Sequence, residues 1–317
     1  MANEATTSTI NDFTYSAVIS TFIMATLAEH SLPMSWCKEF NLIGQPSNAV
    51  DVGYFDSVYG TGDDSGASVD TEYDATEATA LGNTAIASSK YTLTAAEYGI
   101  AVELTDNVGE DSVSGIDMMN NIQAHQQRAL ALAWTKDFVD LFSSISNSVG
   151  TTTAVLTIAQ MLAAQVGPRK RGVLADDGMA YVLENNQVDN LEAELISTNA
   201  AAAVYAAGAD RLLGVGAGSN NGMGSSRHVL SFRGYPVYAS GMNPTANAAA
   251  DVVGCCFTPD GPNNGPYATF GNVIKRAPRL EPDRSAKGRS SDLVLTMRMA
   301  PGELKDESGT AIITDAG

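Results

Sequence analysis

Basic side chains are scarce in the first two-fifths of this 317-residue sequence. Residues 1–127 contain 18 acidic side chains and only two basic ones, Lys38 and Lys90, so they carry −16 of the overall net charge of −18. A segment of this sign repels a polyanion, because binding to nucleic acid depends on basic groups that displace condensed counterions. The N-terminal part is therefore predicted to bind neither nucleic acid nor an anionic membrane surface.

Cysteines and long apolar runs are also few. The three cysteines, two of them adjacent, do not make a disulfide framework, which indicates a reducing compartment. Residues 1–12 lack the basic start of a signal peptide, so none is expected. The apolar stretch 17–32 is interrupted by Glu29 and His30 and ended by Pro33, which makes it too short and too polar to span a membrane.

No recognisable catalytic or cofactor motif is present. The glycine-rich stretch 214–226 lacks the Gly-Lys-Ser/Thr of a phosphate loop and the glycine spacing of a dinucleotide site, so a flexible loop or a hairpin is expected there. No serine lies in a Gly-x-Ser-x-Gly elbow. The histidines have no metal-ligand spacing, and the paired cysteines are read as small buried hydrophobes (His30, His125 and His228; Cys255 and Cys256). We therefore expect no catalytic residue, no cofactor and no bound metal.

The segment 51–97 is acidic and poor in large aliphatic residues. It has one lysine, Lys90, and Thr/Tyr/Val alternation that predicts strands at 69–73 and 90–94. We expect a long hairpin that cannot bury enough apolar surface to offset its own ordering entropy. Such a hairpin is either disordered or lies on another subunit. The low charged fraction of the whole chain, 17%, likewise suits a protein with much surface buried in an assembly.

Apolar periodicity predicts the remaining elements. A strand at 101–105 precedes a stripe of apolar residues from about 112 to 146, which corresponds to a helix of roughly 50 Å. An amphipathic helix is expected at 16–31. The C-terminal half reads as mixed helix and strand, with helices at 157–166 and 176–194 and strands at 172–174, 228–232, 235–239, 251–257, 268–274, 292–299 and 310–314.

The order of these parts resembles the major capsid proteins of tailed bacteriophages, the family with the HK97 fold. The resemblance covers nearly the whole chain, and it is carried by the order of several stretches rather than by one sharp motif. These are Tyr98-Gly-Ile-Ala-Val-Glu-Leu-Thr-Asp106, Gln126-Gln-Arg-Ala-Leu-Ala-Leu-Ala-Trp-Thr-Lys-Asp137, Ser231-Phe-Arg-Gly-Tyr-Pro-Val-Tyr-Ala-Ser240, and the ending from Gly302-Glu-Leu to Thr314-Asp-Ala-Gly317.

The resemblance implies an α+β fold of the HK97 type with four parts. Residues 1–50 correspond to the N-terminal arm and 51–97 to the extended hairpin loop (E-loop). Residues 98–149 and 275–317 correspond to the peripheral domain with its long spine helix, and 150–274 to the axial α/β domain.

The implied function is structural, not enzymatic. Copies of the chain would form hexamers and pentamers of an icosahedral shell that encloses double-stranded DNA without sequence-specific binding. Assembly would take place in the host cytoplasm, and the chain would then reside in the virion without membrane contact. Separate scaffolding, decoration and portal proteins are possible further partners.

Two departures from the family pattern are visible. Only about fifteen residues precede the first expected helix, so any scaffolding is expected to be a separate or already removed protein. Some members crosslink a hairpin lysine to a peripheral-domain asparagine, but here the acidic hairpin has only Lys90, near its base, and no asparagine follows Asn272. We expect no covalent crosslinking of this kind.

Charge complementarity suggests where neighbouring copies meet. The hypothesis pairs acidic residues of one hairpin with basic residues of an adjacent copy, each pair adding about 0–1 kcal/mol and the combined fields setting the register. The residues are Asp63, Asp64, Glu72, Asp74 and Glu77 on one side and Arg276, Arg279, Arg284, Lys287 and Arg289 on the other. An encapsulin-type shell around a cargo enzyme is the alternative with the same fold, and a soluble α/β enzyme is a more distant one.

Overall fold

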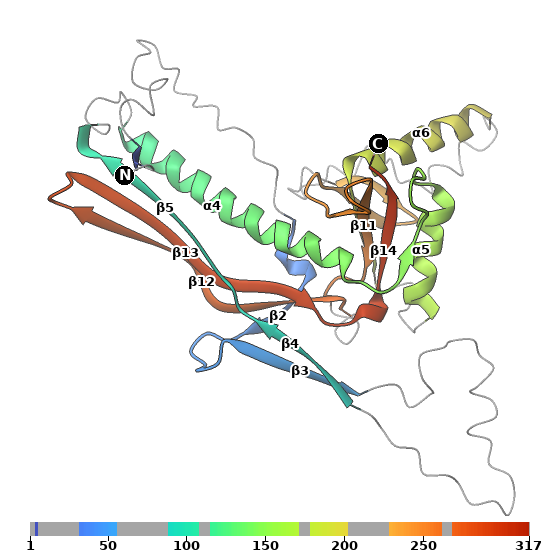
Figure 1. Ribbon diagram of the computed structural model, residues 1–317, viewed down its shortest axis with the longest axis horizontal. Coiled ribbons are helices and arrows are strands. Elements are labelled where there is room, and N and C mark those ends of the chain that lie inside the picture. Colours follow the sequence, from blue (N-terminus) through green and yellow to red (C-terminus); the bar gives the residue numbers. More distant parts are fainter. Residues whose placement is uncertain are drawn as a thin grey trace, which may run out of the picture.

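The computed structural model describes residues 4–5, 32–55, 88–107, 115–170, 178–201, 228–261 and 268–316. These residues form a five-stranded sheet, a seven-stranded sheet and a separate pair of strands. In Figure 1 the five-stranded sheet and one long helix make an extended arm, the seven-stranded sheet makes a lobe, and the pair of strands leaves the arm as a ribbon. These three names are kept below. The α+β class expected from the sequence is confirmed.

The arm is built on two long antiparallel strands. Its strand order is β1 (Glu4–Ala5), β5 (Glu97–Thr105), β13 (Ser290–Glu303), β12 (Phe270–Ser285) and β2 (Lys38–Asn41), with β1 and β2 parallel to their neighbours. The predicted alternation holds, because every second residue of β13 is buried on one face: Leu293, Leu295, Met297 and Met299. The strands expected at 268–274 and 292–299 are confirmed but extend further, because β12 and β13 pair with each other well beyond their apolar parts.

The long helix α4 (Gly115–Asp140) covers the apolar face of the arm sheet (Figure 1). Its 26 residues correspond to about 39 Å, and Leu130, Trp134 and Phe138 are buried beneath it. The expected helix at about 112–146 is therefore confirmed in kind but ends earlier, in the 3-10 turn η2 (Leu141–Ser143). The hydroxyl of Ser143 donates to the carbonyl oxygen of Asp140, which satisfies one of the carbonyl groups left free at this end.

The lobe is a mixed sheet with helices α5 (Ile158–Lys170) and α6 (Asn185–Ala201). Its order is β6 (Ser148–Val149), β14 (Gly309–Asp315), β11 (Asp251–Phe257), β7 (Ala180–Leu183), β9 (Tyr235–Ala239) and β8 (His228–Phe232), and β10 (Thr245–Ala246) also pairs with β11. All seven residues of β11 are buried because this strand lies in the middle of the sheet. Met161 of α5 and Leu191 of α6 belong to the core of the lobe.

The structure corrects one predicted element and relocates another. The expected helix at 176–194 is wrong at its start, because residues 180–183 form β7 and the helix begins only at Asn185. Four consecutive buried residues between two other strands have no helical period, and a short apolar run cannot be assigned by periodicity alone. The last strand, β14, lies in the lobe beside β11, so the range 275–317 is divided between arm and lobe.

The ribbon consists of β3 (Ala49–Phe55) and β4 (Ser88–Thr94), which pair antiparallel from Ala49 opposite Thr94 to Phe55 opposite Ser88. The strand predicted at 90–94 is confirmed. The predicted strands at 69–73 and 172–174, the helix at 16–31 and the glycine-rich stretch 214–226 lie outside the described residues.

Candidate assembly site

The ribbon is anchored where it leaves the arm. Leu93 of β4 is 5% exposed and packs with Val273 of β12 and Leu304. Glycines in the arm make room for it, because a methyl group on Gly302 would lie 2.4 Å from one Leu93 methyl and a methyl group on Gly271 3.0 Å from the other. The ribbon therefore leaves the arm from a fitted apolar socket.

Lys90, the one lysine of the acidic hairpin, lies on the ribbon opposite Gly53. Its ammonium group is 2.7 Å from the Asp51 carboxylate, which also accepts a hydrogen bond from the Thr92 hydroxyl. The hydrogen bond from Lys90, followed by that from Thr92, lowers the pKa of Asp51. Lys90 is thus engaged in an exposed cross-strand ion pair within its own chain.

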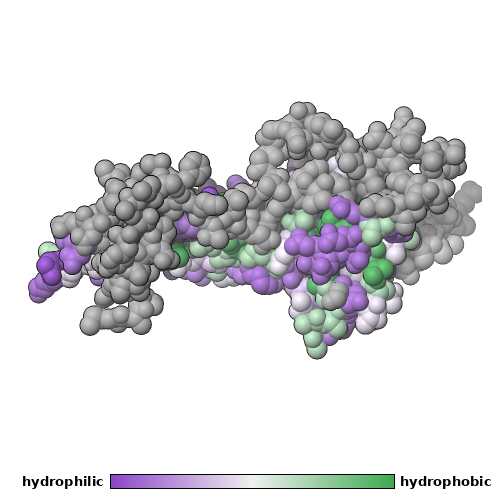
Figure 2. Space-filling view, turned by 90° about the horizontal axis from the view of Figure 1, so that it is seen from above, coloured by the Kyte–Doolittle hydropathy of each residue, from purple (hydrophilic) through white to green (hydrophobic). Residues whose placement is uncertain are grey.

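The basic residues expected to contact a neighbour lie on β12 and in the turn that follows it. Three of them already have acidic partners in the same chain: Arg276 with Glu97 at 2.6 Å, Arg279 with Glu281 at 2.9 Å, and Arg284 with Asp106 at 2.5 Å. Lys287 and Arg289 are exposed in the turn between β12 and β13, and the far end of the arm is largely hydrophilic in Figure 2. The acidic partners Asp63, Asp64, Glu72, Asp74 and Glu77 all lie outside the described residues, so the structure does not bring the two predicted sets together.

The Arg284 pair ties the end of β5 to β12. Its guanidinium donates hydrogen bonds to both carboxylate oxygens of Asp106, the second at 2.8 Å. These bonds, with the charge of Arg284, lower the pKa of Asp106 and raise that of Arg284. A bidentate pair of this kind is directional, so it stiffens the far half of the arm.

The arm face opposite α4 is divided into zones of different charge. Near the ribbon, Arg276 lies opposite Arg298, which lies opposite Glu97. Because directly opposed residues of antiparallel strands point to the same side, this row carries two positive charges and one negative one.

Toward the far end of the same face the charge changes sign. Asp283, Asp292 and Glu103 lie opposite one another on β12, β13 and β5, so three carboxylates form a row across three strands. The Ser290 hydroxyl donates to Glu103 at 2.6 Å, and Oδ1 of Asp292 is buried with no hydrogen-bond partner within the described parts of the chain. Sequence reasoning missed this row, because residues 103, 283 and 292 meet only through the strand register.

An aromatic cluster joins the arm to the lobe. Phe138 of α4 contacts Phe257 of β11 and Phe270 of β12, with ring centroids 5.8 and 5.1 Å apart, and stacks on Trp134 at 5.4 Å. The indole N–H of Trp134 donates to the side-chain oxygen of Asn272 at 3.1 Å, so its polar edge is satisfied in the core. The two parts therefore share one continuous core at this joint.

Polar contacts close the rim of the same joint. The Ser144 hydroxyl donates to Glu303 at 3.0 Å, and the backbone N–H of Ser146 donates to Asp306 at 2.7 Å. Burial raises the pKa of Glu303, the Ser144 hydrogen bond opposes this, and the charge of Asp306 adds to it.

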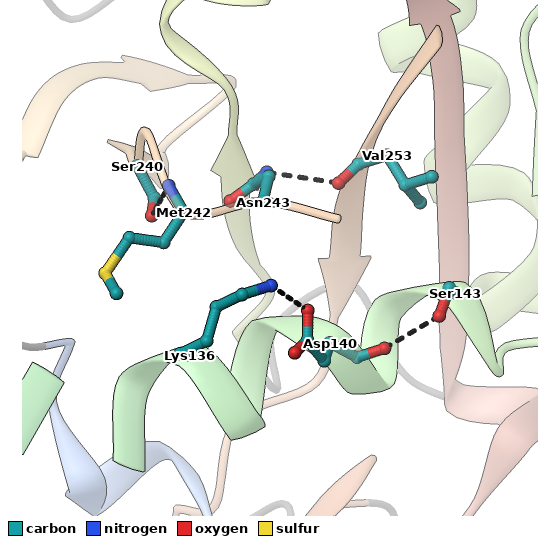
Figure 3. Close-up of polar contacts among 7 residues, drawn as sticks. All are labelled: Lys136, Asp140, Ser143, Ser240, Met242, Asn243 and Val253. Atoms are coloured by element: carbon teal, nitrogen blue, oxygen red, sulfur yellow. Dashed lines mark hydrogen bonds and ion pairs between the residues drawn. The ribbon is translucent and has the colours of Figure 1, made fainter. Parts of the chain in front are cut away.

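The end of α4 also faces the loop between β9 and β10 (Figure 3). Lys136 pairs with Asp140 one helical turn on, and the amide group of Asn243 in the loop donates to the Val253 carbonyl at 3.1 Å. The Asn243 contact holds the loop to β11, whereas the Lys136 pair lies within α4.

Asp251 fixes the opposite end of β11. Its fully buried carboxylate accepts hydrogen bonds from the Asn247 side chain and from the backbone N–H of Thr153, and these bonds, in that order, lower its pKa. Thr153 and the three consecutive residues 247–249 all have positive φ, a conformation that non-glycine residues rarely adopt. The Asp251 carboxylate thus holds two strained turns together.

The residues considered for chemistry are placed as packing or surface groups. Cys37, Cys255 and Cys256 are buried, and burial raises the pKa values of Cys37 and Cys255, which keeps these thiols protonated. His125 is exposed on α4, His228 begins β8, and His30 lies outside the described residues. Within the described ranges no group of three or more His, Cys, Asp or Glu side chains is arranged to hold a metal ion. None of the described helices is long and apolar enough to cross a membrane.

Comparison with known proteins gives fold-level matches. Neither a protein-family model nor a curated protein matches the sequence. Among solved structures, the capsid of the cyanophage P-SCSP1u has a TM-score of 0.63 at 11% identity, covering 96% of this chain and 94% of that one. The acid-stable capsid of the Helicobacter pylori bacteriophage KHP30 has a TM-score of 0.61 at 12% identity, covering 99% and 98%. The holo-SrpI encapsulin complex of Synechococcus elongatus has a TM-score of 0.60 at 7% identity, covering 88% and 85%. The chain therefore has the HK97 fold of phage capsid proteins, a fold that encapsulin shells share.

Proposed function

We propose that this chain is the major capsid protein of a tailed bacteriophage. Copies of it form the hexamers and pentamers of an icosahedral shell that encloses double-stranded DNA. The observation that carries the proposal is the extent of the fold match, since the capsids of cyanophage P-SCSP1u and of the Helicobacter pylori bacteriophage KHP30 align with 96% and 99% of this chain. The role is structural, and no catalytic residue, cofactor or metal takes part in it.

The shape of the arm supports an assembling subunit. Its sheet is covered by α4 on one face, whereas Ala101 and Glu281 on the other face are exposed. Within the part of the chain that the structure describes, both long edges of the β5–β13–β12 sheet are paired over only short stretches, by β1 and by β2. A sheet that is left open in this way is typical of a surface that another chain covers.

The division into parts follows from the same proposal. Residues 1–50 act as the N-terminal arm, 51–97 as the extended loop, 98–149 with 275–317 as the peripheral domain, and 150–274 as the axial domain. The pairing of β14 with β11 supports moving residues 309–315 into the axial part.

The contact between copies is proposed to be electrostatic at its rim. The acidic hairpin residues of one copy meet the basic residues of the next, although the intrachain pairs of Arg276, Arg279 and Arg284 compete for this role. Reversing the charges at Arg279 and Arg284 is expected to weaken assembly and change its salt dependence, with Arg233→Glu on the exposed turn of the lobe as the control. Unchanged assembly with unchanged salt sensitivity would contradict this contact.

Expression of the chain followed by size-exclusion chromatography and electron microscopy tests the function. Closed shells tens of nanometres across that contain nucleic acid support the capsid proposal. Shells that co-purify with a cargo protein instead support the encapsulin alternative, which the match to an encapsulin complex keeps in view. A monomer or dimer under all assembly conditions contradicts both shell functions and favours the distant alternative of a soluble enzyme.

The location and further partners follow from the capsid role. The mature chain resides in the virion after assembly in the host cytoplasm. Scaffolding, decoration and portal proteins, where they take part, are separate chains.

A further inference from the structure

The ribbon enters and leaves the arm through two short connections. The first is the loop 42–48, between β2 and β3, and the second is the pair of residues 95–96, between β4 and β5. The backbone N–H of Ala95 donates to the carbonyl oxygen of Asn48 at 2.9 Å, which joins the two connections. A rotation of the ribbon relative to the arm therefore requires a change in the backbone conformation of these residues.

The loop 42–48 has little apolar contact of its own. Leu42 is buried, but Ile43 is 55% exposed, and a side chain on Gly44 would meet nothing within 4 Å. Hydrophobic packing therefore holds only the first residue of the loop.

Lys275 supplies the missing attachment. It follows the last residue of β12 that pairs with β2, at an irregularity in the pairing with β13. Its ammonium group donates to the carbonyl oxygens of Leu42 at 3.3 Å, Ser47 at 2.9 Å and Gln45. An ammonium group has three N–H donors, so this one cation is fully satisfied by three carbonyl groups of the same loop.

We propose that Lys275 is a latch that fixes the direction of the ribbon, and that residues 42–48 and 95–96 are the hinge that it locks. Leu93 in its glycine socket holds the β4 side of the ribbon, and Val50 and Val52 of β3 pack against the same cluster. The exposed part of the loop that leads into β3 is held by Lys275. The seven residues of β3 span about 20 Å, so a rotation of about 10° at the hinge moves the far end of the ribbon by about 3–4 Å. This proposal involves only the connections between the ribbon and the arm, and it does not depend on the shell function.

Hydrogen exchange of the full-length chain, read by mass spectrometry, tests the latch. Lys275→Met keeps the length of the side chain and removes the ammonium group. The amides of Gln45 and Ala95, which close the hinge, are expected to exchange about 10- to 100-fold faster, because hydrogen bonds to a charged group are lost. The amides of β11 and β14 in the lobe are expected to keep their rates.

Lys90→Met is the matched control. It removes a charge of the same sign from the ribbon itself, but the Lys90 pair with Asp51 lies within the ribbon and does not cross the hinge. In Lys90→Met, the exchange rates of the Gln45 and Ala95 amides are expected to match those of the unchanged protein. Equal rates in the Lys275→Met and unchanged proteins, or faster exchange throughout the lobe as well, would overturn the latch.

A second variant separates the ammonium group from its carbon chain. In Lys275→Ala, added n-butylammonium is expected to slow exchange at Ala95 at least twofold relative to the same concentration of sodium chloride. If the amine and the salt give the same rate, the cation is not what holds the loop, and the proposal fails.

Discussion

The socket between ribbon and arm allows a quantitative test with two small substitutions. In Gly302→Ala the new methyl group would lie 2.4 Å from one methyl carbon of Leu93, well inside van der Waals contact. Leu93 has little room to retreat, because it is 5% exposed and its other methyl group already lies against Gly271. Overpacking of this kind typically costs about 1–3 kcal/mol. Leu93→Ala, which empties the socket, is expected to cost about 2–5 kcal/mol.

The double variant separates a shared contact from two independent effects. With Leu93 shortened, the alanine at 302 enters vacated space, so its own cost is expected to fall to near zero. The two changes are therefore expected to combine less than additively, with a coupling of about 1–3 kcal/mol. Gly53→Ala on β3 is the control, because a methyl group there meets nothing within 4 Å.

Urea unfolding followed by tryptophan fluorescence measures all variants on the unassembled chain. The sequence has two tryptophans, and both Trp36 and Trp134 belong to the core cluster at the joint between arm and lobe. Free energies that add to within about 0.5 kcal/mol would mean that Leu93 and Gly302 do not compete for the same space, and the socket would be refuted.

Three further predictions rest on other contacts. Gly150→Ala is expected to prevent correct folding of the lobe, because the new methyl group would lie 2.1 Å from the backbone oxygen of Ile313; a soluble variant with an unchanged circular-dichroism melting curve would contradict this. Trp134→Phe keeps the ring packing but leaves a buried amide oxygen without its donor, so the free energy of unfolding should fall by about 1–3 kcal/mol in urea titrations. The pKa of Asp251 is lower in the folded protein than the usual 3.8 of an unfolded chain. The ionised carboxylate therefore stabilises the fold fully at pH values above 3.8, and this stabilisation is lost as the pH falls through the lower pKa of the folded state. Asp251→Asn should therefore lower the thermal midpoint at pH 6 and flatten its dependence on pH below 4, and an identical acid profile in both proteins would argue against this role.

Regular local patterns made much of the fold predictable. The alternation at 292–299 arises because one face of the strand is buried. The apolar stripe that includes Leu130 and Phe138 arises because one face of the helix is buried. Both depend only on residues close together in the sequence, so they were correctly assigned. The ends of the elements were not correctly predicted. The strand β12 continues through residues 279–284, which are mostly exposed and charged, because β13 pairs with it.

The missed features depend on residues that are distant in the sequence. The local pattern of residues 180–183 does not distinguish a strand from a helix, and these residues form β7 because β11 and β9 flank them. The row of three carboxylates joins residues almost two hundred positions apart. One missed signal was local: Thr157 and Gln160 exchange side-chain and backbone hydrogen bonds at the start of α5, a capping box that the sequence Thr157-Ile-Ala-Gln160 already contains.

The interface hypothesis shows a further limit of composition. Six basic residues between 275 and 289 suggested a surface waiting for an acidic partner, yet Arg276 and Arg284 are paired with Glu97 and Asp106 from a strand that precedes them by about 180 residues. Net charge along the sequence does not reveal which charges a chain has already neutralised within itself.

The way in which arm and lobe share the chain has a consequence for folding order. The lobe sheet is begun by β6 to β11, the chain then makes β12 and β13 of the arm, and only afterwards supplies β14, which lies between β6 and β11. The arm in turn needs β5, made before any strand of the lobe. The arm sheet cannot be completed until β6 to β11 of the lobe have been synthesised, and the lobe sheet lacks β14 until after the last arm strand has been made. Contacts of such large sequence separation fold slowly, and the edge of β11 that β14 will cover remains unpaired in the meantime. Until β14 is made, this open edge of β11 is available to pair with another chain.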